Sequence, residues 1–234
     1  SVYNQALERG VATYVPRLFN KVHTGIDCPV KRAVSPEVIC KLMTDQKPLP
    51  EKLAFSRDLF VLLFLLRGMP FVDLAFLRRC DLQGNVITYH RRKTSRKLTV
   101  VVGKEAMEII RRYMYAIPDS PYLFPIIQNP GENEYGQYTR MLRLLNHRLT
   151  QVANTLGIRE RLSTYVARHT WATTALRQNY NSSLICNAMG HSSVKVTETY
   201  FQPYRDDEVN RMNRSLITYI LSKKKRGTDK NIRG

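Results

Sequence analysis

The 234-residue chain has few acidic residues. It contains 19 Asp and Glu against 37 Lys and Arg, which gives a formal net charge of +18 at pH 7. A field of this sign attracts polyanions over long distances. Nucleic acid is therefore the leading candidate partner, and an anionic membrane surface is the second.

Long hydrophobic runs and paired cysteines are also missing. The longest apolar run covers residues 59–66, far short of the roughly 20 residues of a membrane-spanning helix. The N-terminus has no signal-peptide pattern. Cys28, Cys40, Cys80 and Cys186 are widely spaced, with no CxxC pair and no histidine at metal-ligand spacing. We therefore expect free thiols and a soluble protein in a reducing cytoplasm.

Acidic residues are absent throughout residues 168–197, although Arg168 stands there beside apolar residues such as Ala167 and Trp171. A guanidinium among apolar groups loses hydration that only a good anionic partner restores. Because this stretch supplies no carboxylate, an anion from outside the chain is a candidate partner for Arg168.

The segments before residue 36 predict the end of one domain and the start of another. Residues 1–9 predict a helix that ends at Gly10 and begins in mid-pattern, as the end of a truncated upstream domain would. Residues 21–34 mix Gly, Pro and basic residues without a period and predict a linker. Ser35 followed by Pro36 is typical of a helix start.

The rest of the chain is mostly helical in pattern. The predicted helices cover residues 51–68, 70–77, a stretch from 105 to a Pro-rich loop at 117–131, then 135–156, 164–179, 183–189 and 206–221. Residues 85–92 and 97–102 are β-rich and flank the basic turn KTSR, which predicts an antiparallel hairpin. Residues 193–200 fit a helix or a strand. We predict a mainly α fold with a small antiparallel β-hairpin or sheet (α+β).

Three groups near the C-terminal end of this pattern can carry chemistry. Tyr165 and Arg168 share one face of a predicted helix. Gly190 is placed to end a short helix just before His191, and Tyr200 follows nine residues later. Taken singly, each group also has a structural interpretation: an arginine paired with a distant carboxylate, a histidine in a turn, and one of 13 tyrosines.

Taken together, these groups resemble a known family. RHTWAT (168–173), MGHSS (189–193) and TETY (197–200), in this order, are similar to the C-terminal signature of the tyrosine recombinases, or phage integrases. RGMPFVDLAFLRRCDL (67–82) and TYHRRKTSRKLTV (88–100) extend the resemblance over most of residues 35–202, and in detail it is nearest to integrases of conjugative and mobilizable elements.

The resemblance implies a domain order and a reaction. Residues 1–20 would be the last helix of a core-binding domain, residues 21–34 a linker, residues 35–222 a catalytic domain with the tyrosine recombinase fold, and residues 223–234 a basic tail. A tyrosine hydroxyl of such a domain attacks a DNA phosphodiester, leaving a 3′-phosphotyrosine link and a free 5′-hydroxyl. Neither a metal nor a nucleotide cofactor takes part.

The same resemblance assigns roles to individual residues. Tyr200 would be the nucleophile, Arg168 would bind the nonbridging phosphate oxygens, and His191 would hydrogen-bond one of them. Lys93, at the turn of the basic hairpin, would donate a proton to the departing 5′-oxygen. Without the resemblance, Lys93 is equally well interpreted as one of several solvated basic residues in that turn.

Two positions depart from the family pattern. Tyr165 stands where a histidine is usual; it can still donate a hydrogen bond to phosphate but is a poorer proton shuttle. Pro70 stands where the first catalytic arginine is usual, and Arg67 lies about one helical turn earlier. We assign the catalytic role to Arg67, with capping of the preceding helix as the alternative. Asp73, where a glutamate is usual, is interpreted as a cap of its own short helix or as a group that orients an arginine.

Partners and competing functions follow from charge and family. Double-stranded DNA is the expected partner, with Lys31, Arg32, Arg91 and Arg92 as phosphate contacts and a bacterial, nucleoid-associated location. The family implies a homotetramer on DNA, in which residues 206–221 dock on a neighbour or pack on their own domain, and a monomer is expected off DNA. The competing functions are a basic DNA-binding protein that has lost cleavage and a type IB topoisomerase.

Overall fold

The chain folds into two compact units, residues 1–31 and 32–234. The computed structural model describes residues 2–15, 33–190 and 213. In the first unit, helix α1 (Val2–Glu8) ends just before Gly10, whose φ is 65°. The predicted helix over residues 1–9 is therefore confirmed. The predictions for residues 21–32, 193–200 and 223–234 lie outside the described residues, as does the helix predicted at 206–221 apart from Asn213.

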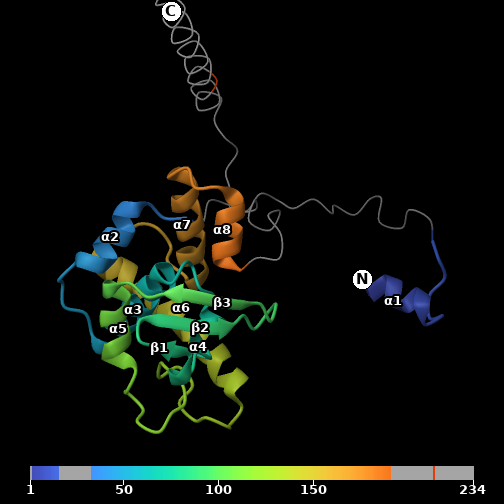
Figure 1. The fold of residues 1–234 in the computed structure, drawn as a ribbon, viewed down its shortest axis with the longest axis horizontal. Helices are drawn as coiled ribbons and strands as arrows, with labels where there is room; N and C mark the ends of the chain where they lie inside the picture. The colour runs from blue at the N-terminus through green and yellow to red at the C-terminus, as the bar shows by residue number, and fades with distance from the viewer. Residues whose placement is uncertain (1, 16–32, 191–212, 214–234) are drawn as a thin grey trace, which may run out of the picture. The chain divides into compact units, whose positions relative to one another are not determined.

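The second unit is mainly helical with one small sheet (Figure 1), as predicted. In chain order its elements are α2 (Pro36–Thr44), α3 (Glu51–Leu65), α4 (Phe71–Ala75), the 3-10 turn η1 (Arg79–Asp81), β1 (Leu82–Gln83), β2 (Val86–His90), β3 (Lys97–Val101), α5 (Lys104–Tyr113), α6 (Glu134–Leu156), α7 (Thr164–Arg177) and α8 (Ser182–Met189).

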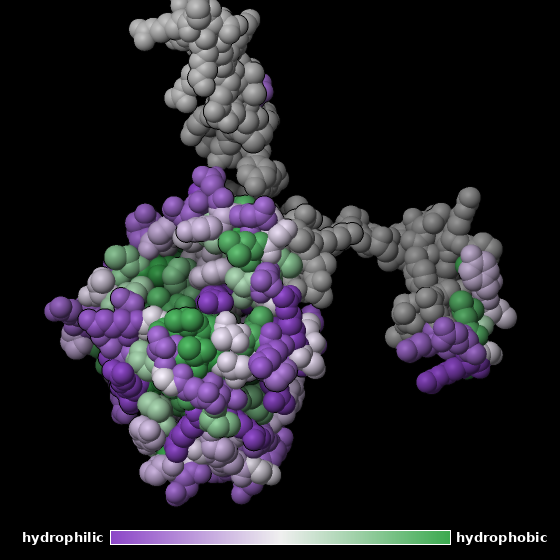
Figure 2. Space-filling model, viewed as in Figure 1, coloured by the Kyte–Doolittle hydropathy of each residue, from purple (hydrophilic) through white to green (hydrophobic). Residues whose placement is uncertain are grey.

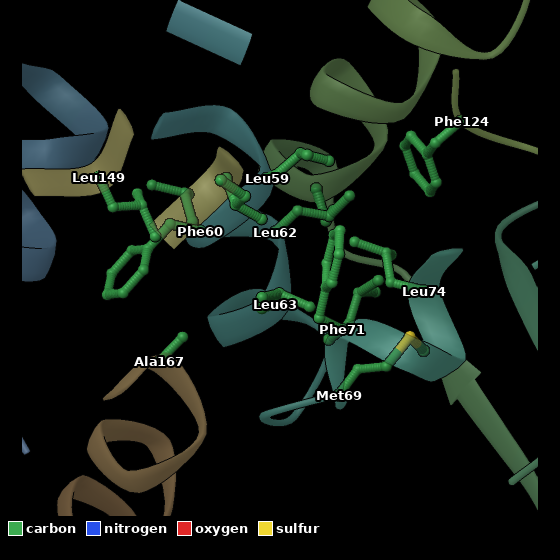
Figure 3. Close-up of a cluster of buried hydrophobic side chains, with 14 of the residues drawn as sticks. Leu59, Phe60, Leu62, Leu63, Met69, Phe71, Leu74, Phe124, Leu149 and Ala167 are labelled. Atoms are coloured by element: carbon green, nitrogen blue, oxygen red, sulfur yellow. The ribbon is translucent and has the colours of Figure 1, made fainter. Parts of the chain in front are cut away.

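Helix α3 is the centre of this unit. It packs against α2, α5, α6 and α7, and Leu59, Phe60, Leu62 and Leu63 are fully buried. A helix that is apolar on nearly every side is expected to be covered on every side. Figure 3 shows Phe60 facing Leu149 of α6 and Ala167 of α7. Each such side chain contributes about 1.5–3 kcal/mol on burial, so α3 fixes where α7 lies.

The sheet has the strand order β1-β2-β3 and is antiparallel throughout. Val86 pairs with Val101 and His90 with Lys97, which confirms the predicted hairpin. Ile87 and Tyr89 are buried, whereas His90 is exposed, so the odd-numbered residues of β2 face the core. Strand β1 was not predicted, because two residues are too few to show a period.

One predicted helix end is corrected, and one predicted helix start is confirmed. Helix α3 ends at Leu65 and not near residue 68, because Arg67 and Gly68 both have left-handed backbones, with φ of 61° and 66°. Helix α2 begins as predicted, with Ser35 at the N-cap and Pro36 at the first helical position, although the Ser35 side chain makes no capping bond. That hydroxyl instead bonds the Glu37 carboxylate and lowers the pKa of Glu37.

Gly68 generates a stability prediction. A Cβ added there would lie 3.1 Å from the Arg168 Cα, whereas a Cβ at Gly84, also left-handed with φ of 60°, meets nothing within 4 Å. We expect Gly68→Ala to lower the free energy of unfolding by about 2–4 kcal/mol, against about 1–2 kcal/mol for Gly84→Ala. Urea unfolding of both variants measures the difference. Equal losses of unfolding free energy in the two variants would mean that the residues connecting α3 and α4 are not in tight contact with α7.

Candidate functional site

Helix α7 carries a buried arginine, as its sequence predicts. The Ser163 side chain accepts a hydrogen bond from the Val166 backbone NH (3.3 Å) and so caps the helix start. Arg168 is only 4% exposed. Its Nη1 donates to the Gly68 carbonyl and its Nη2 to the Met189 carbonyl at 3.0 Å. Both of these acceptors are neutral, so neither offsets the charge of the guanidinium.

A second guanidinium, that of Arg91, also donates to the Met189 carbonyl. Arg91 follows the last residue of β2 and is 7% exposed. Its Nη1 donates to the Met189 carbonyl at 3.2 Å and to the Gly190 carbonyl at 2.7 Å. The Met189 oxygen therefore accepts from both Arg91 and Arg168. Sequence reasoning placed Arg91 among the basic residues of the hairpin surface, but the structure buries it.

Asp73 holds Arg91 from the other side. This carboxylate is 3% exposed; its Oδ2 accepts from Arg91 Nε at 3.3 Å and its Oδ1 from the Arg92 backbone NH at 3.0 Å. Helix α4 has no side-chain cap bond. The interpretation of Asp73 as a helix cap is therefore wrong, and the alternative, that Asp73 orients an arginine, agrees with its contacts.

Gly190 allows the hairpin to lie against the end of α8. It ends that helix with a left-handed backbone, φ of 65°, as the sequence predicted. A Cβ on Gly190 would lie 2.7 Å from Arg91 Cδ and 2.7 Å from Leu98 Cδ1. Glycine is thus required at this position both by the backbone conformation and by the close approach of the two side chains.

Arg67 lies at the edge of this group. Its Nη1 donates to the Thr99 carbonyl of β3 at 3.3 Å, so it bonds the sheet and not the end of α3. Several charged groups shift the pKa of the buried Tyr89 hydroxyl. The net effect is a raised pKa: burial and then Asp73 raise it, and Arg91, Arg168 and Arg67 partly oppose the rise. Three arginines and one carboxylate thus act on Tyr89, the fourth residue of β2.

The other predicted residues have more open environments. Lys93 is exposed at the tip of the β2–β3 turn, and Figure 2 shows mainly hydrophilic side chains on the side of the molecule where this hairpin ends. Arg92 is also exposed, and its guanidinium carbon lies 3.7 Å from the centre of the Phe76 ring. Tyr165 is 47% exposed and contacts His169 edge to face at 4.5 Å. Tyr165 therefore does not share the buried environment of Arg168.

Four predicted residues, Lys31, Arg32, His191 and Tyr200, lie outside the described residues. Within the described ranges, no group of three or more His, Cys, Asp or Glu side chains could hold a metal ion. No helix among the same residues is long and apolar enough to span a bilayer. Cys40 and Cys80 are free thiols, as predicted.

Sequence reasoning missed the buried position of Arg91, although a signal for it exists. Residues 87, 89 and 91 are buried and alternate with the less buried residues 88 and 90, so a period of two continues the buried face of β2 through Tyr89 to Arg91. The roles of Gly68, Met189 and Gly190 have no comparable signal, because they depend on backbone carbonyls and on the absence of a side chain.

Comparisons with known proteins agree with this fold. The sequence model of the phage integrase family matches residues 32–206. No curated protein matches the sequence significantly. Among solved structures, XerA recombinase has a TM-score of 0.58 at 18% identity, covering 91% of this chain and 72% of that chain.

Two further structures are similar. The Tn1549 transposon integrase, in complex with transposon right end DNA, has a TM-score of 0.60 at 14% identity and covers 85% of this chain and 70% of its own. The XerH site-specific recombinase, bound to its difH substrate, has a TM-score of 0.56 at 17% identity; this chain is covered over 78% of its length and spans 53% of XerH. Since the family match covers most of the sequence, this protein belongs to the phage integrase family, the tyrosine recombinases.

Proposed function

We propose that residues 35–222 are the catalytic domain of a site-specific DNA recombinase that acts through a 3′-phosphotyrosine intermediate. The observation that carries the proposal is the pair of buried guanidiniums, Arg91 and Arg168, that meet at the Met189 carbonyl. The next residues, Gly190 and His191, belong to the sequence motif in which the family places a phosphate-binding histidine.

The geometry suits the transition state of phosphoryl transfer. Attack on a phosphodiester places extra negative charge on the nonbridging oxygens of a pentacoordinate phosphorus. Fixed cations stabilise that charge most when they are held in place beforehand and shielded from water. Arg168 fulfils both conditions, since two carbonyl oxygens fix its guanidinium and only 4% of the residue is exposed. Its planar fork can bond two phosphate oxygens at once.

We assign the remaining steps to residues of the family motifs. The Tyr200 hydroxyl gives its proton to solvent and its oxygen bonds the phosphorus as the bond from phosphorus to the 5′-oxygen breaks, and Lys93 Nζ gives the departing 5′-oxygen a proton. Tyr165 and His191 donate hydrogen bonds to the phosphate. Because one ester replaces another, the bond energy is kept, and attack by a second strand's 5′-hydroxyl reverses the step.

We further propose that DNA is bound by charge and that the active assembly is a tetramer. The net charge of +18 supports the first point. The Tn1549 and XerH structures, which contain DNA, support it by analogy. Lys31, Arg32 and Arg92 are the proposed phosphate contacts, residues 1–20 the end of a core-binding domain, and the bacterial nucleoid the site of action.

Assembly would use the apolar stripe of residues 206–221. Its members are spaced as on one helix face: Val209, Met212, Leu216 and Ile220. The described part of the chain offers an apolar cavity of about 520 Å³ beside Trp171, Ala175 and Ile185. A stripe of this kind, from the same or a neighbouring copy, would cover such a surface.

The central test is covalent trapping on nicked duplexes with randomised sequence around the nick. We expect the wild type to form an adduct that survives denaturation. The short strand that carries the released 5′-hydroxyl diffuses away, and its loss prevents religation. Tyr200→Phe should form none, and Arg168→Lys should react at least ~100-fold more slowly. The control is Tyr115→Phe, which removes an exposed hydroxyl on another surface.

The other outcomes of this assay separate the competing functions. DNA binding without any adduct would mean a DNA-binding protein that has lost cleavage, as Pro70 and Tyr165 allow. Relaxation of a supercoiled plasmid without strand exchange would mean a type IB topoisomerase. Either result overturns the recombinase assignment.

The role of Lys93 predicts a chemical rescue. A duplex with sulfur in place of the bridging 5′-oxygen releases a thiolate, which leaves without a proton. Lys93→Ala should therefore lose at least ~100-fold in cleavage rate on the oxygen substrate and recover to within ~10-fold of the wild type on the sulfur substrate. Tyr200→Phe should stay inactive on both. Equal losses of Lys93→Ala on both substrates would show that Lys93 is not the proton donor.

Phosphate contacts predict a salt dependence. Each contact contributes about 0.9 to the slope of log affinity against log salt concentration. Lys31→Ala and Arg92→Ala should each flatten that slope by about one, as measured by fluorescence anisotropy on a labelled duplex. Lys47→Ala is the control: it removes the same charge from a lysine that bonds the Thr155 carbonyl at 2.7 Å. If the slope falls equally in all three variants, binding depends on net charge alone, and Lys31 and Arg92 are not specific phosphate contacts.

A further inference from the structure

We infer that Arg91 is the second phosphate-binding arginine of the site and takes the role that Arg67 was assigned from the sequence. The inference rests on the proposed function and deepens it. It explains how the site reaches two guanidiniums although Pro70 occupies the position of the family's first arginine.

The position of Pro70 offers no cation in the folded chain. Pro70 is the N-cap residue of α4, with φ of −63°. Its neighbour in the fold, Asp73, projects from the first turn of the same helix and bonds Arg91 Nε. Helix α4 therefore supplies no arginine to the site but supplies Asp73, whose carboxylate holds Arg91.

Arg91 lies where a partner of Arg168 is needed. Arg91 Nη1 and Arg168 Nη2 are 3.2 Å and 3.0 Å from the same Met189 oxygen, so the two nitrogens are no farther apart than these two distances combined. Guanidiniums this close can contact different oxygens of one phosphate. The bonds of Arg91 use Nε and Nη1, and no described residue accepts from its Nη2. That nitrogen remains for the phosphate.

Arg91 is also held more firmly than Arg67. Its guanidinium donates three bonds that fix it, one to a buried carboxylate and two to the carbonyls of residues 189 and 190. Arg67 is half-buried, its hydrogen bond among the described residues goes to the Thr99 carbonyl, and it lines the apolar cavity beside Trp171. A group that is fixed before the reaction loses less free energy in ordering and stabilises the transition state more.

The charge balance points the same way. Arg91 and Arg168 are 7% and 4% exposed, and Asp73 pairs with Arg91. Carbonyl oxygens solvate a guanidinium but cancel none of its charge. An anion placed between two buried guanidiniums is attracted by both. A phosphodiester supplies one negative charge, and the attacked phosphorus carries more.

The test compares Arg91→Ala, Arg91→Lys and Arg67→Ala in the trapping assay. We expect both Arg91 variants to cleave at least ~100-fold more slowly than the wild type and Arg67→Ala less than ~10-fold more slowly. Arg111→Lys, a change on the exposed face of α5, is the control for arginine loss. Far-UV circular dichroism and thermal unfolding of Arg91→Lys confirm that this variant is folded at the assay temperature.

A substrate change separates contact with phosphate from a purely structural role. A methyl group in place of one nonbridging oxygen removes the charge of the scissile phosphate, and with it most of the need for a second cation. On that duplex Arg91→Ala should react within ~10-fold of the wild type, whereas a misfolded site would stay slow on both substrates.

The outcomes distinguish this inference from the proposed function. If the wild type forms no adduct with any duplex, the proposed function fails and the inference fails with it. If the wild type cleaves and Arg91→Lys cleaves within ~10-fold of it, the function stands and the inference alone is overturned. The same holds if Arg67→Ala is the slower variant, or if the uncharged phosphate gives no recovery of Arg91→Ala.

Discussion

The Met189 carbonyl oxygen is the point on which the site depends. It accepts from Arg91 of the β2–β3 connection and from Arg168 of α7, and it belongs to the last residue of α8. Three elements that are distant in the sequence are therefore tied by one backbone atom. The shared acceptor helps to fix the separation of two buried like charges that repel each other.

The fold supplies the rigidity that this arrangement needs. Helix α3 is covered by α6 and α7, and the burial of residues such as Leu59 and Phe60 fixes α7 against it. The connection after α3 then turns back over α7, where the Gly68 carbonyl accepts from Arg168. The apolar core thus positions the polar site: α3 sets where α7 lies, and the residues that end α3 help to hold its arginine.

Local patterns in the sequence were sufficient for much of this fold. Helices α6, α7 and α8 and the β2–β3 hairpin begin and end within about two residues of their predicted bounds. The burial of Arg168 followed from its apolar neighbours. What failed were features set by distant contacts. The early end of α3 depends on Gly68 lying against the Arg168 backbone, and the role of Asp73 depends on the arrival of Arg91.

The β2–β3 turn divides into a fixed base and a tip. At the base, the Arg91 NH donates to the Arg96 carbonyl at 2.9 Å, the Ser95 NH to the Arg91 carbonyl at 2.8 Å, and the Arg92 NH to Asp73. Lys93 stands beyond these bonds, exposed to solvent. If Lys93 is the proton donor and Arg91 binds the phosphate, as proposed, the exposed lysine can change its rotamer while the arginine two residues earlier stays bonded. Such an enzyme would withhold its acid without releasing its substrate, so that strand breakage would be controlled separately from recognition of the phosphate.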